Sequence, residues 1–377
     1  MARACSSWPW RSVLAALAVC GALLAVSAWA VAEETTQKDG DWDVFPTQVR
    51  LKDLPDGTTP GLNGEYGKWE TSADGKGALP FPTSTGGNMQ IECQKATIRV
   101  DANGDGNVRN DRPCNDSQTG TVIRFKFKYA DGSEGDYASR IHYEMSCHEI
   151  RWERACYREA TAYGQKIILV DDSNNGKYTD ALQDGLVIGN RVSYVSPVVI
   201  IDGELYDFKT DDAGSKIWLK KYTGATGKIN LKMLPALRSM IVGDSNRCLQ
   251  LAGGKDGSVT VPPGTYQVIC GKVASGTNTA LIGKGDTKPI TVSENGEAEL
   301  TWGPPVKLDF KAVANKVKDK KGKEEKELTL SVPRLLGVGG EEYYGFKPAA
   351  AFYTVSVFDE DGKPAGKFDS WTKTGGG

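Results

Sequence analysis

The sequence is poor in histidine and lacks the local signatures of the common catalytic and nucleotide-binding sites. It contains two histidines, His142 and His148. The segment from His148 opens like the helix of a zinc protease, but Trp152 stands where that motif requires its second histidine. No Gly-x-Ser-x-Gly nucleophile elbow occurs, and a phosphate-loop spacing at 271–276 is followed by Thr277 where the motif requires lysine. These absences predict a protein without catalytic activity.

The chain also lacks a strong charge of either sign and a second long apolar run. Its one long apolar run, Val13 to Ala32, follows Arg3 and Arg11 and precedes a polar stretch, which is the layout of a secretory signal cleaved after Ala32. Loss of these two arginines changes the formal net charge from −2 to −4. This near balance does not suggest nucleic acid or an anionic membrane as a partner. We therefore expect residues 33–377 to be secreted or periplasmic, with an uncleaved membrane anchor as the alternative.

Cysteine usage agrees with export. Beyond the predicted signal the chain has an even number of cysteines, which in an oxidising compartment suggests disulfides. Sequence proximity favours three pairs, although six cysteines permit fifteen pairings. A zinc site is the alternative, but the Cys-x-x-Cys spacing that it needs is absent. The predicted pairs are Cys93 with Cys114, Cys147 with Cys156, and Cys248 with Cys270.

Short apolar runs bounded by Gly, Asp and Asn predict an all-β protein. In the segment 122–129, aromatic and aliphatic residues alternate with Arg124, Lys126 and Lys128, which places the cations on the solvent side of a strand. Similar runs recur about every ten residues, and only 140–154 could equally form a helix. Residues 33–90 are rich in Gly, Pro, Thr and Asp, and we expect them to form an irregular extension. The predicted organisation is a signal peptide (1–32), this extension (33–90), a β-rich domain (91–234), a small module (235–303) and a C-terminal module (304–377).

One segment suggests what kind of modules these are. Residues 261–273, Val-Pro-Pro-Gly-Thr-Tyr-Gln-Val-Ile-Cys-Gly-Lys-Val, place a turn before alternating apolar residues. The segment resembles the strand and turn of carboxypeptidase regulatory-like and immunoglobulin-like domains of exported proteins. This resemblance implies two or three β-sandwich modules.

The sharpest chemical feature is an acidic loop at 101–111. Oxygen-bearing side chains stand at its first, third and fifth positions, and Gly106 stands at the sixth. Calcium prefers six to eight oxygen ligands, so its ligands must converge from a curled backbone, and glycine permits the positive φ that the curl needs. The loop resembles those of EF-hands and dockerin repeats, but Arg112 stands where their closing carboxylate would be. The predicted ligands are Asp101, Asn103, Asp105, Asn107 through its carbonyl, and Asp111 as the substitute closing residue.

A second acidic loop begins at residue 171 and also follows a run ending in Ile-x-Val. Aligning its Gly176 with Gly106 places its oxygen-bearing side chains at the same positions. The alternative for both loops is an ordinary Asn/Asp/Gly turn whose side chains cap their own backbone. The predicted ligands here are Asp171, Ser173, Asn175, Lys177 at the seventh position, Asp180 and Asp184.

Together these features predict an exported, calcium-supported structural or interaction protein. It resembles exported bacterial proteins of unassigned function that combine such loops with small β-sandwich modules. Its partner would be an envelope or extracellular protein or a glycan. The alternative is a carbohydrate-binding protein or a hydrolase of surface polysaccharide. Tryptophans of the chain either include a sugar-stacking platform or pack in a core or a domain seam. The tryptophans available are Trp42, Trp69, Trp152, Trp218, Trp302 and Trp371.

Overall fold

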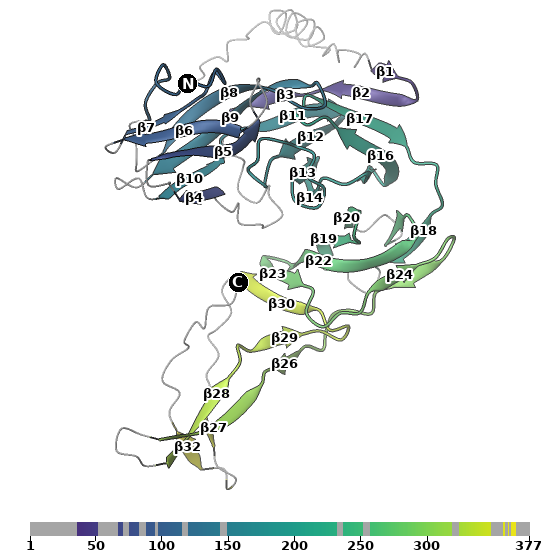
Figure 1. Cartoon of the computed structure of the whole chain (residues 1–377). Coiled ribbons are helices and arrows are strands. Elements are labelled where there is room, and N and C mark those ends of the chain that lie inside the picture. Colours follow the sequence, from purple (N-terminus) through teal and green to yellow (C-terminus); the bar gives the residue numbers. More distant parts are fainter. Residues whose placement is uncertain are drawn as a thin grey trace, which may run out of the picture.

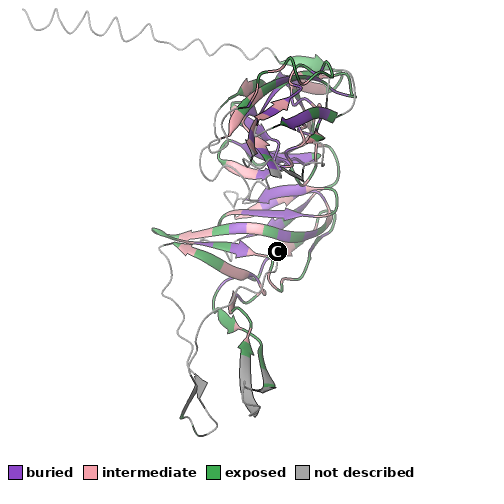
Figure 2. Ribbon diagram, turned by 60° about the vertical axis from the view of Figure 1, so that its left-hand side comes forward, coloured by how far each residue is buried: buried purple, intermediate pink, exposed green. Residues whose placement is uncertain are grey.

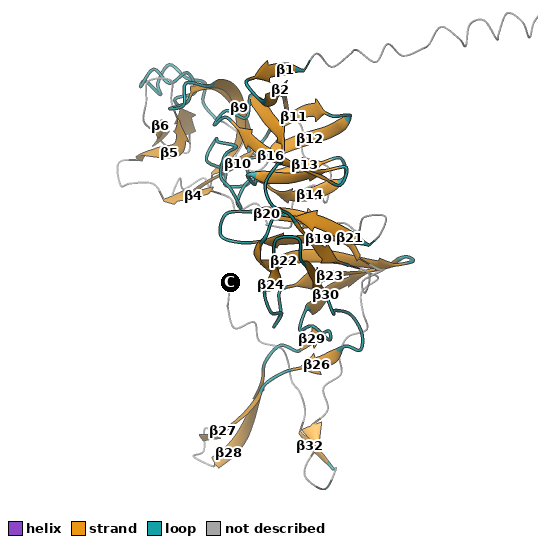
Figure 3. Ribbon diagram, turned by 90° about the vertical axis from the view of Figure 1, so that its right-hand side faces the viewer, coloured by secondary structure: helices purple, strands orange, loops and turns teal. Residues whose placement is uncertain are grey.

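The described part of the chain is built from β-strands. A computed structural model describes residues 36–51, 67–70, 75–82, 88–94, 97–114, 120–143, 149–231, 237–251, 257–318, 324–347, 357–358, 361 and 363–366. These residues contain no helix, and the strands connect through turns and loops (Figure 3). None of them therefore forms a helix with the length and apolar character needed to cross a bilayer. The all-β prediction is confirmed at this level, whereas the predicted signal peptide lies outside the described residues.

Four sheets surround a first core. The first has the order β1 (Gln37–Asp39), β2 (Trp42–Pro46), β17 (Lys216–Lys221), β16 (Glu204–Thr210), β15 (Val198–Ile201). The second is β14 (Arg191–Tyr194), β13 (Gly185–Ile188), β12 (Gln165–Val170), β11 (Tyr157–Ala162), β3 (Gln48–Arg50). The third is β4 (Gly67–Glu70), β10 (Glu149–Arg154), β9 (Glu134–Tyr143), β8 (Thr121–Lys128), and the fourth is β5 (Lys76–Pro82), β6 (Asn88–Gln94), β7 (Thr97–Val100). All pairings in these sheets are antiparallel.

The remaining sheets form a second group that follows β17 (Figure 1). One has the order β21 (Ser258–Val261), β18 (Gly227–Asn230), β25 (Glu297–Glu299), with β18 and β25 parallel. The large sheet runs β20 (Cys248–Leu251), β19 (Leu237–Gly243), β22 (Gly264–Ser275), β23 (Asn278–Gly283), β30 (Glu342–Lys347), β29 (Arg334–Leu336), β26 (Lys307–Asp309), and β24 (Ile290–Val292) pairs with β22. Two hairpins lie apart: β27 (Ala312–Lys318) with β28 (Glu324–Leu330), and β31 (Val357–Phe358) with β32 (Pro364–Gly366).

The first core depends on strand alternation. Along β8, Phe125 and Phe127 are buried while Arg124 and Lys126 are exposed, because successive side chains of a strand point to opposite faces. Phe125 stacks on Phe127 with ring centroids 5.5 Å apart, and Phe81 from β5 packs against both rings. All four sheets contribute buried side chains to this one cluster. In Figure 2, residues coloured as buried run through the upper part of the molecule.

The expectation of an irregular extension at 33–90 is wrong for its described residues. They form β1 to β5 and the start of β6, and they pair with strands far along the chain: β2 with β17, β3 with β11, and β4 with β10. The physical reason is that short strands need long-range partners, which local composition does not reveal. The ambiguous segment 140–154 forms parts of β9 and β10 in its described residues.

The pairing also bears on the predicted boundaries. Strand β18 precedes the boundary expected near residue 235, yet it pairs with β21 and β25 of the second group. The large sheet joins strands from both sides of residue 303. The residues predicted as two separate C-terminal modules therefore share one sheet.

The predicted disulfide pairs are wrong. Cys156 and Cys248 are free thiols, so the pairs predicted for them do not form, and Cys93 is disulfide-bonded. Cys93 and Cys114 both oppose Ile98 from its two sides, so they lie two strand spacings apart, about 9.5 Å, and a disulfide needs Cα atoms closer than about 7 Å. Sequence proximity fails here because an intervening strand separates the two cysteines.

The other two pairs fail in related ways. Cys248 pairs with Gly243 and Cys270 with Ile241, which places the two cysteines on opposite sides of β19. Cys156 is buried as a free thiol with its Sγ 3.5 Å from the Tyr178 hydroxyl, and Cys147 lies outside the described residues.

Candidate functional site

The two acidic loops follow strands that end in a buried valine, and they share one backbone conformation. Loop 1 (101–111) follows β7 and loop 2 (171–184) follows β12. The fourth and sixth positions have positive φ in both: Gly104 (71°) and Gly106 (83°) in loop 1, Asn174 (54°) and Gly176 (83°) in loop 2. Glycine and asparagine are the residues that adopt this conformation at least cost. The alignment of the two loops by sequence is thus matched by their geometry.

The first aspartate of each loop organises the curl. In loop 1, Asp101 accepts hydrogen bonds from the Asp105 amide through Oδ1 (3.1 Å) and from the Gly106 amide through Oδ2 (2.8 Å). In loop 2, Asp171 accepts from the Asn175 amide (3.2 Å) and the Gly176 amide (2.8 Å) in the same way.

The side chain of the fifth residue also accepts a backbone amide in each loop. The Asp105 and Asn175 side chains each accept from the amide two residues later. Each loop is thereby held by its own side chains in a closed turn.

The oxygens of loop 2 converge on one place. The Ser173 hydroxyl lies 3.1 Å from Asp171 Oδ1 and 2.9 Å from Asp180 Oδ2. A hydroxyl has a single proton, so it can donate to only one of these carboxylates at a time. Asp184 approaches from the other end of the loop and accepts from the amides of Ser173 (3.3 Å) and Asp180 (2.9 Å). Three carboxylates therefore surround the short segment 173–180.

Burial makes this crowding costly for negative charge. Asp171 and Asp184 are fully buried. Burial raises the pKa of Asp171, and burial together with the charge of Asp171 raises the pKa of Asp184 to about 9. Ionising both carboxylates in the loop by itself is thus unfavourable. A cation placed among these oxygens would favour the ionised form of both carboxylates.

Loop 1 has similar chemistry in a more exposed setting. Asp105 is exposed, and the Asn110 side chain and the Asn107 amide donate to it, which lowers its pKa. Asp111 accepts from the Ala102 amide through Oδ1, while its Oδ2 is buried without a hydrogen-bond partner. Burial, reinforced by the charges of Asp101 and Asp105, raises the pKa of Asp111. The predicted closing residue thus lies within electrostatic reach of the first and fifth positions.

The structure also shows where the remaining predicted ligands point. Asn103 lies in the turn, with its amide nitrogen 3.1 Å from Asp105 Oδ2. The Asn107 side chain accepts from the Arg109 amide. The Lys177 ammonium lies 3.2 Å from Asp212 Oδ2, so Lys177 could serve an ion in loop 2 only through its carbonyl.

Three aromatic residues that anchor loop 2 were not predicted from the sequence. The fully buried Tyr137 of β9 donates to Asp171 Oδ2 at 2.7 Å, Tyr129 donates to the Gly176 carbonyl, and Trp152 Nε1 of β10 donates to the Asn174 carbonyl at 2.9 Å. Their side chains belong to the first core. No local sequence signal identifies these contacts, because they join segments about 20 to 50 residues apart. Loop 2 is consequently fixed to the third sheet as well as to its own.

The carboxylate, thiol and imidazole groups of the described residues do not by themselves form a metal site. In the described part of the chain, no group of three or more His, Cys, Asp and Glu side chains is arranged to hold a metal ion. A calcium ion in either loop would thus need serine, asparagine and backbone oxygens in addition to the carboxylates, as calcium loops commonly supply.

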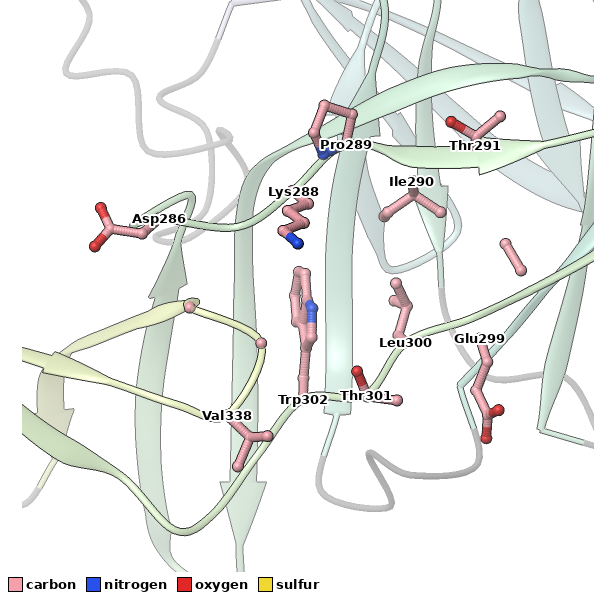
Figure 4. A pocket seen from close by; sticks show the side chains of 13 residues that line it. Asp286, Lys288, Pro289, Ile290, Thr291, Glu299, Leu300, Thr301, Trp302 and Val338 are labelled. Carbon is pink, nitrogen blue, oxygen red and sulfur yellow. The ribbon is translucent and has the colours of Figure 1, made fainter.

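A separate cavity lies in the second group of sheets. Its volume is about 580 Å³, within the range of small-molecule sites. Figure 4 shows the Trp302 indole standing between the segment 286–291 and the turn that contains Val338, with the Lys288 side chain pointing toward it. Thr291, Glu299 and Thr301 also line the cavity. Trp302 is 7% exposed, so most of its ring packs in the second core.

Comparisons with protein-family models, with curated proteins and with solved structures find no match to this chain, so no family assignment follows from them.

Proposed function

We propose that the chain is an exported, calcium-supported β-sandwich protein that acts as a structural or interaction protein without catalytic activity. The single observation that carries the calcium assignment is the convergence of Asp171, Asp180 and Asp184 around Ser173 in loop 2. The leader-like residues 1–32 support export. In this proposal the partner is an envelope or extracellular protein or a glycan.

Two further features support a cation in these loops. Each loop repeats the same amide-to-aspartate bonds, which leave the first aspartate facing the turn with its position fixed in advance. No salt bridge between described residues joins a lysine or arginine to Asp171, Asp180 or Asp184. These three carboxylates therefore lack the direct positive partner that Arg154 gives to the neighbouring Asp172, and calcium would supply it.

The proposal predicts that EDTA lowers the melting temperature. At an affinity near 10⁻⁴ M, millimolar calcium stabilises each loop by about 1.4 kcal/mol, which corresponds to about 2–5 °C. The double variant Asp101→Ala with Asp171→Ala is expected to melt at the same temperature with and without EDTA. Differential scanning calorimetry measures both. The matched control is Asp202→Ala, which alters an exposed turn and should keep the response to EDTA.

A direct binding measurement separates loop 2 from an unspecific effect of the chelator. Terbium replaces calcium and is excited by a nearby aromatic ring, and Trp152 and Tyr137 both contact loop 2. Excitation of tryptophan should therefore give terbium emission that Asp171→Ala abolishes and Asp101→Ala reduces far less. Equal melting curves in calcium and EDTA, with no terbium emission, would reject the calcium assignment.

Glycan binding is the second candidate, and the Trp302 cavity favours it. An aromatic wall beside hydroxyl, carboxylate and ammonium groups is a combination that suits a sugar ring. A glycan array probed with the purified chain tests this candidate. Saturable binding that Lys288→Ala weakens and Lys228→Ala leaves unchanged would support it, whereas an array without saturable signal would leave the structural role.

A further inference from the structure

Exposed apolar side chains concentrate in one part of the molecule. Of the eleven exposed large apolar side chains in the described residues, six lie between residues 306 and 338. This segment contains β26, β29 and the hairpin β27–β28, which extends away from the second core (Figures 1 and 3). The six are Val306, Leu308, Phe310, Val313, Val332 and Val338.

Strand β26 combines an apolar stripe with an open edge. It is the last strand of the large sheet, and among the described residues no strand pairs with its outer edge. Val306, Leu308 and Phe310 are 51%, 48% and 49% exposed. Leu308 is the middle residue of β26, and Val306 and Phe310 flank the strand, so an extended chain through all three places them on one face. Leu308 opposes Leu335 of β29, which in turn opposes Tyr343 of β30, a residue packed against the second core. The core face of the sheet thus continues onto β26, where it remains uncovered.

We propose that β26 is a self-association edge: a second copy of the chain pairs with it antiparallel about a two-fold axis through Leu308. An unpaired strand edge offers a row of backbone donors and acceptors to another strand, and a two-fold axis lets the same edge serve both copies. The inference deepens the proposed interaction role by naming the partner, and it does not depend on calcium.

Residue chemistry selects the register. Directly opposite residues of an antiparallel pair share a face, so apolar positions must oppose apolar positions. A register centred on Leu308 places Val306 opposite the second copy's Phe310, and Lys307 opposite the second copy's Asp309. The two-fold axis produces two such pairs of Lys307 with Asp309, and both are attractive.

The neighbouring register that also keeps the faces matched is unfavourable. Centred on Asp309, it would place this carboxylate opposite its own copy and Lys307 opposite the second copy's Lys311, so all its charged contacts would be repulsive. The register one step the other way, centred on Lys307, would place this lysine opposite its own copy and is repulsive as well. In the favoured register, Asp309 is flanked by Lys307 of the second copy and by Arg334 of its own chain, whose Nη2 lies 2.6 Å from Asp309 Oδ2. The edge is therefore self-complementary in one register.

Sedimentation equilibrium of the full exported chain over the micromolar range tests the proposal, run once in calcium and once in EDTA. We expect a reversible dimer in both. Lys307→Glu should raise the dimer dissociation constant roughly tenfold, because both symmetric charge pairs become repulsive. Lys311→Glu is the matched control, since it makes the same charge change on the same face but opposes Pro305 in the favoured register.

Leu308→Lys should abolish the dimer. Because Leu308 is half exposed, the fold should persist, as near-UV circular dichroism would show.

A cross-link tests the axis itself. Two Leu308→Cys side chains would face each other across it, so mild oxidation with diamide should join the dimer covalently, whereas Val332→Cys, on an exposed residue outside β26, should not. A monomer at every concentration, or a dimer that Leu308→Lys leaves intact, would overturn the proposal. If EDTA does not change the melting temperature but the chain still forms the dimer, only the calcium assignment is refuted.

Discussion

Tyr137 joins two sheets through one buried hydroxyl. It belongs to β9, and it donates at 2.7 Å to Asp171, which follows β12. Tyr137→Phe keeps the ring packed against Phe81 and Phe127 but removes a donor from a buried carboxylate. We expect the free energy of unfolding to fall by about 1–3 kcal/mol, the usual cost of a buried polar group that loses its partner.

Urea unfolding measures this loss, and Tyr222→Phe is the control. The Tyr222 hydroxyl donates to the Ala225 carbonyl at 3.3 Å in an exposed position, so its removal should change stability by less than about 0.5 kcal/mol. Equal effects of the two variants would mean that the contact with Asp171 contributes nothing.

Two buried cysteines allow a prediction on pH. Burial raises the pKa of Cys114 and of Cys248 to about 11 from an ordinary value of 9.0. Thiolate is the reactive form, so both cysteines should resist a thiol reagent at pH 8 in the native chain and react after unfolding. Between pH 9 and 11 the unfolded chain loses these protons and the native chain keeps them, so stability should fall as pH rises through this window. Rapid labelling of either thiol in the native chain would contradict the burial.

At the scale of single elements, β8 shows how far alternation determines a strand. Phe127→Ala is expected to cost about 3–5 kcal/mol because it removes a ring from the first core, whereas Lys126→Ala on the opposite face should change stability by less than about 0.5 kcal/mol. Chemical denaturation of the two neighbouring variants measures the contrast. Similar costs for the two would contradict the assignment of faces.

The local sequence pattern predicted strands such as β8 well. It did not predict the strands that form only by pairing with distant parts of the chain. The alternating segment 122–129 is the strand β8 (Thr121–Lys128), shifted by one residue, and both acidic loops have the curled backbone that their glycines indicated. The N-terminal strands were missed because β2 and β3 are stabilised by β17 and β11, more than a hundred residues away.

The disulfides and the loop anchors failed for the same reason. Whether Cys93 lies next to Cys114 depends on the strand carrying Ile98 between them, and sequence spacing does not encode that strand. Likewise, the contact of Trp152 with the Asn174 carbonyl depends on how β10 lies across loop 2. Sequence thus predicted the chemistry of the candidate site but not the residues that hold it in place.

At the scale of the whole molecule, β15 connects the two cores. Its four residues, Val198–Ile201, are all buried. Val199 and Ile201 belong to the first core, whereas Val198 and Ile200 belong to the second, together with Leu205 of β16. A short continuous apolar run is typical of a strand covered on both faces. One strand therefore contributes to two hydrophobic cores, and loss of either core exposes it.

This shared strand predicts that the two groups of sheets unfold together. Ile200→Ala and Ile201→Ala remove similar side chains from opposite faces of β15, and each should cost about 2–5 kcal/mol. If the cores are coupled, differential scanning calorimetry should show one transition that both variants move to lower temperature by similar amounts. Two resolved transitions, of which Ile200→Ala moves only one and Ile201→Ala only the other, would mean that β15 separates two independent domains. Because the side chains of β15 alternate between the cores within four residues, we expect the single transition.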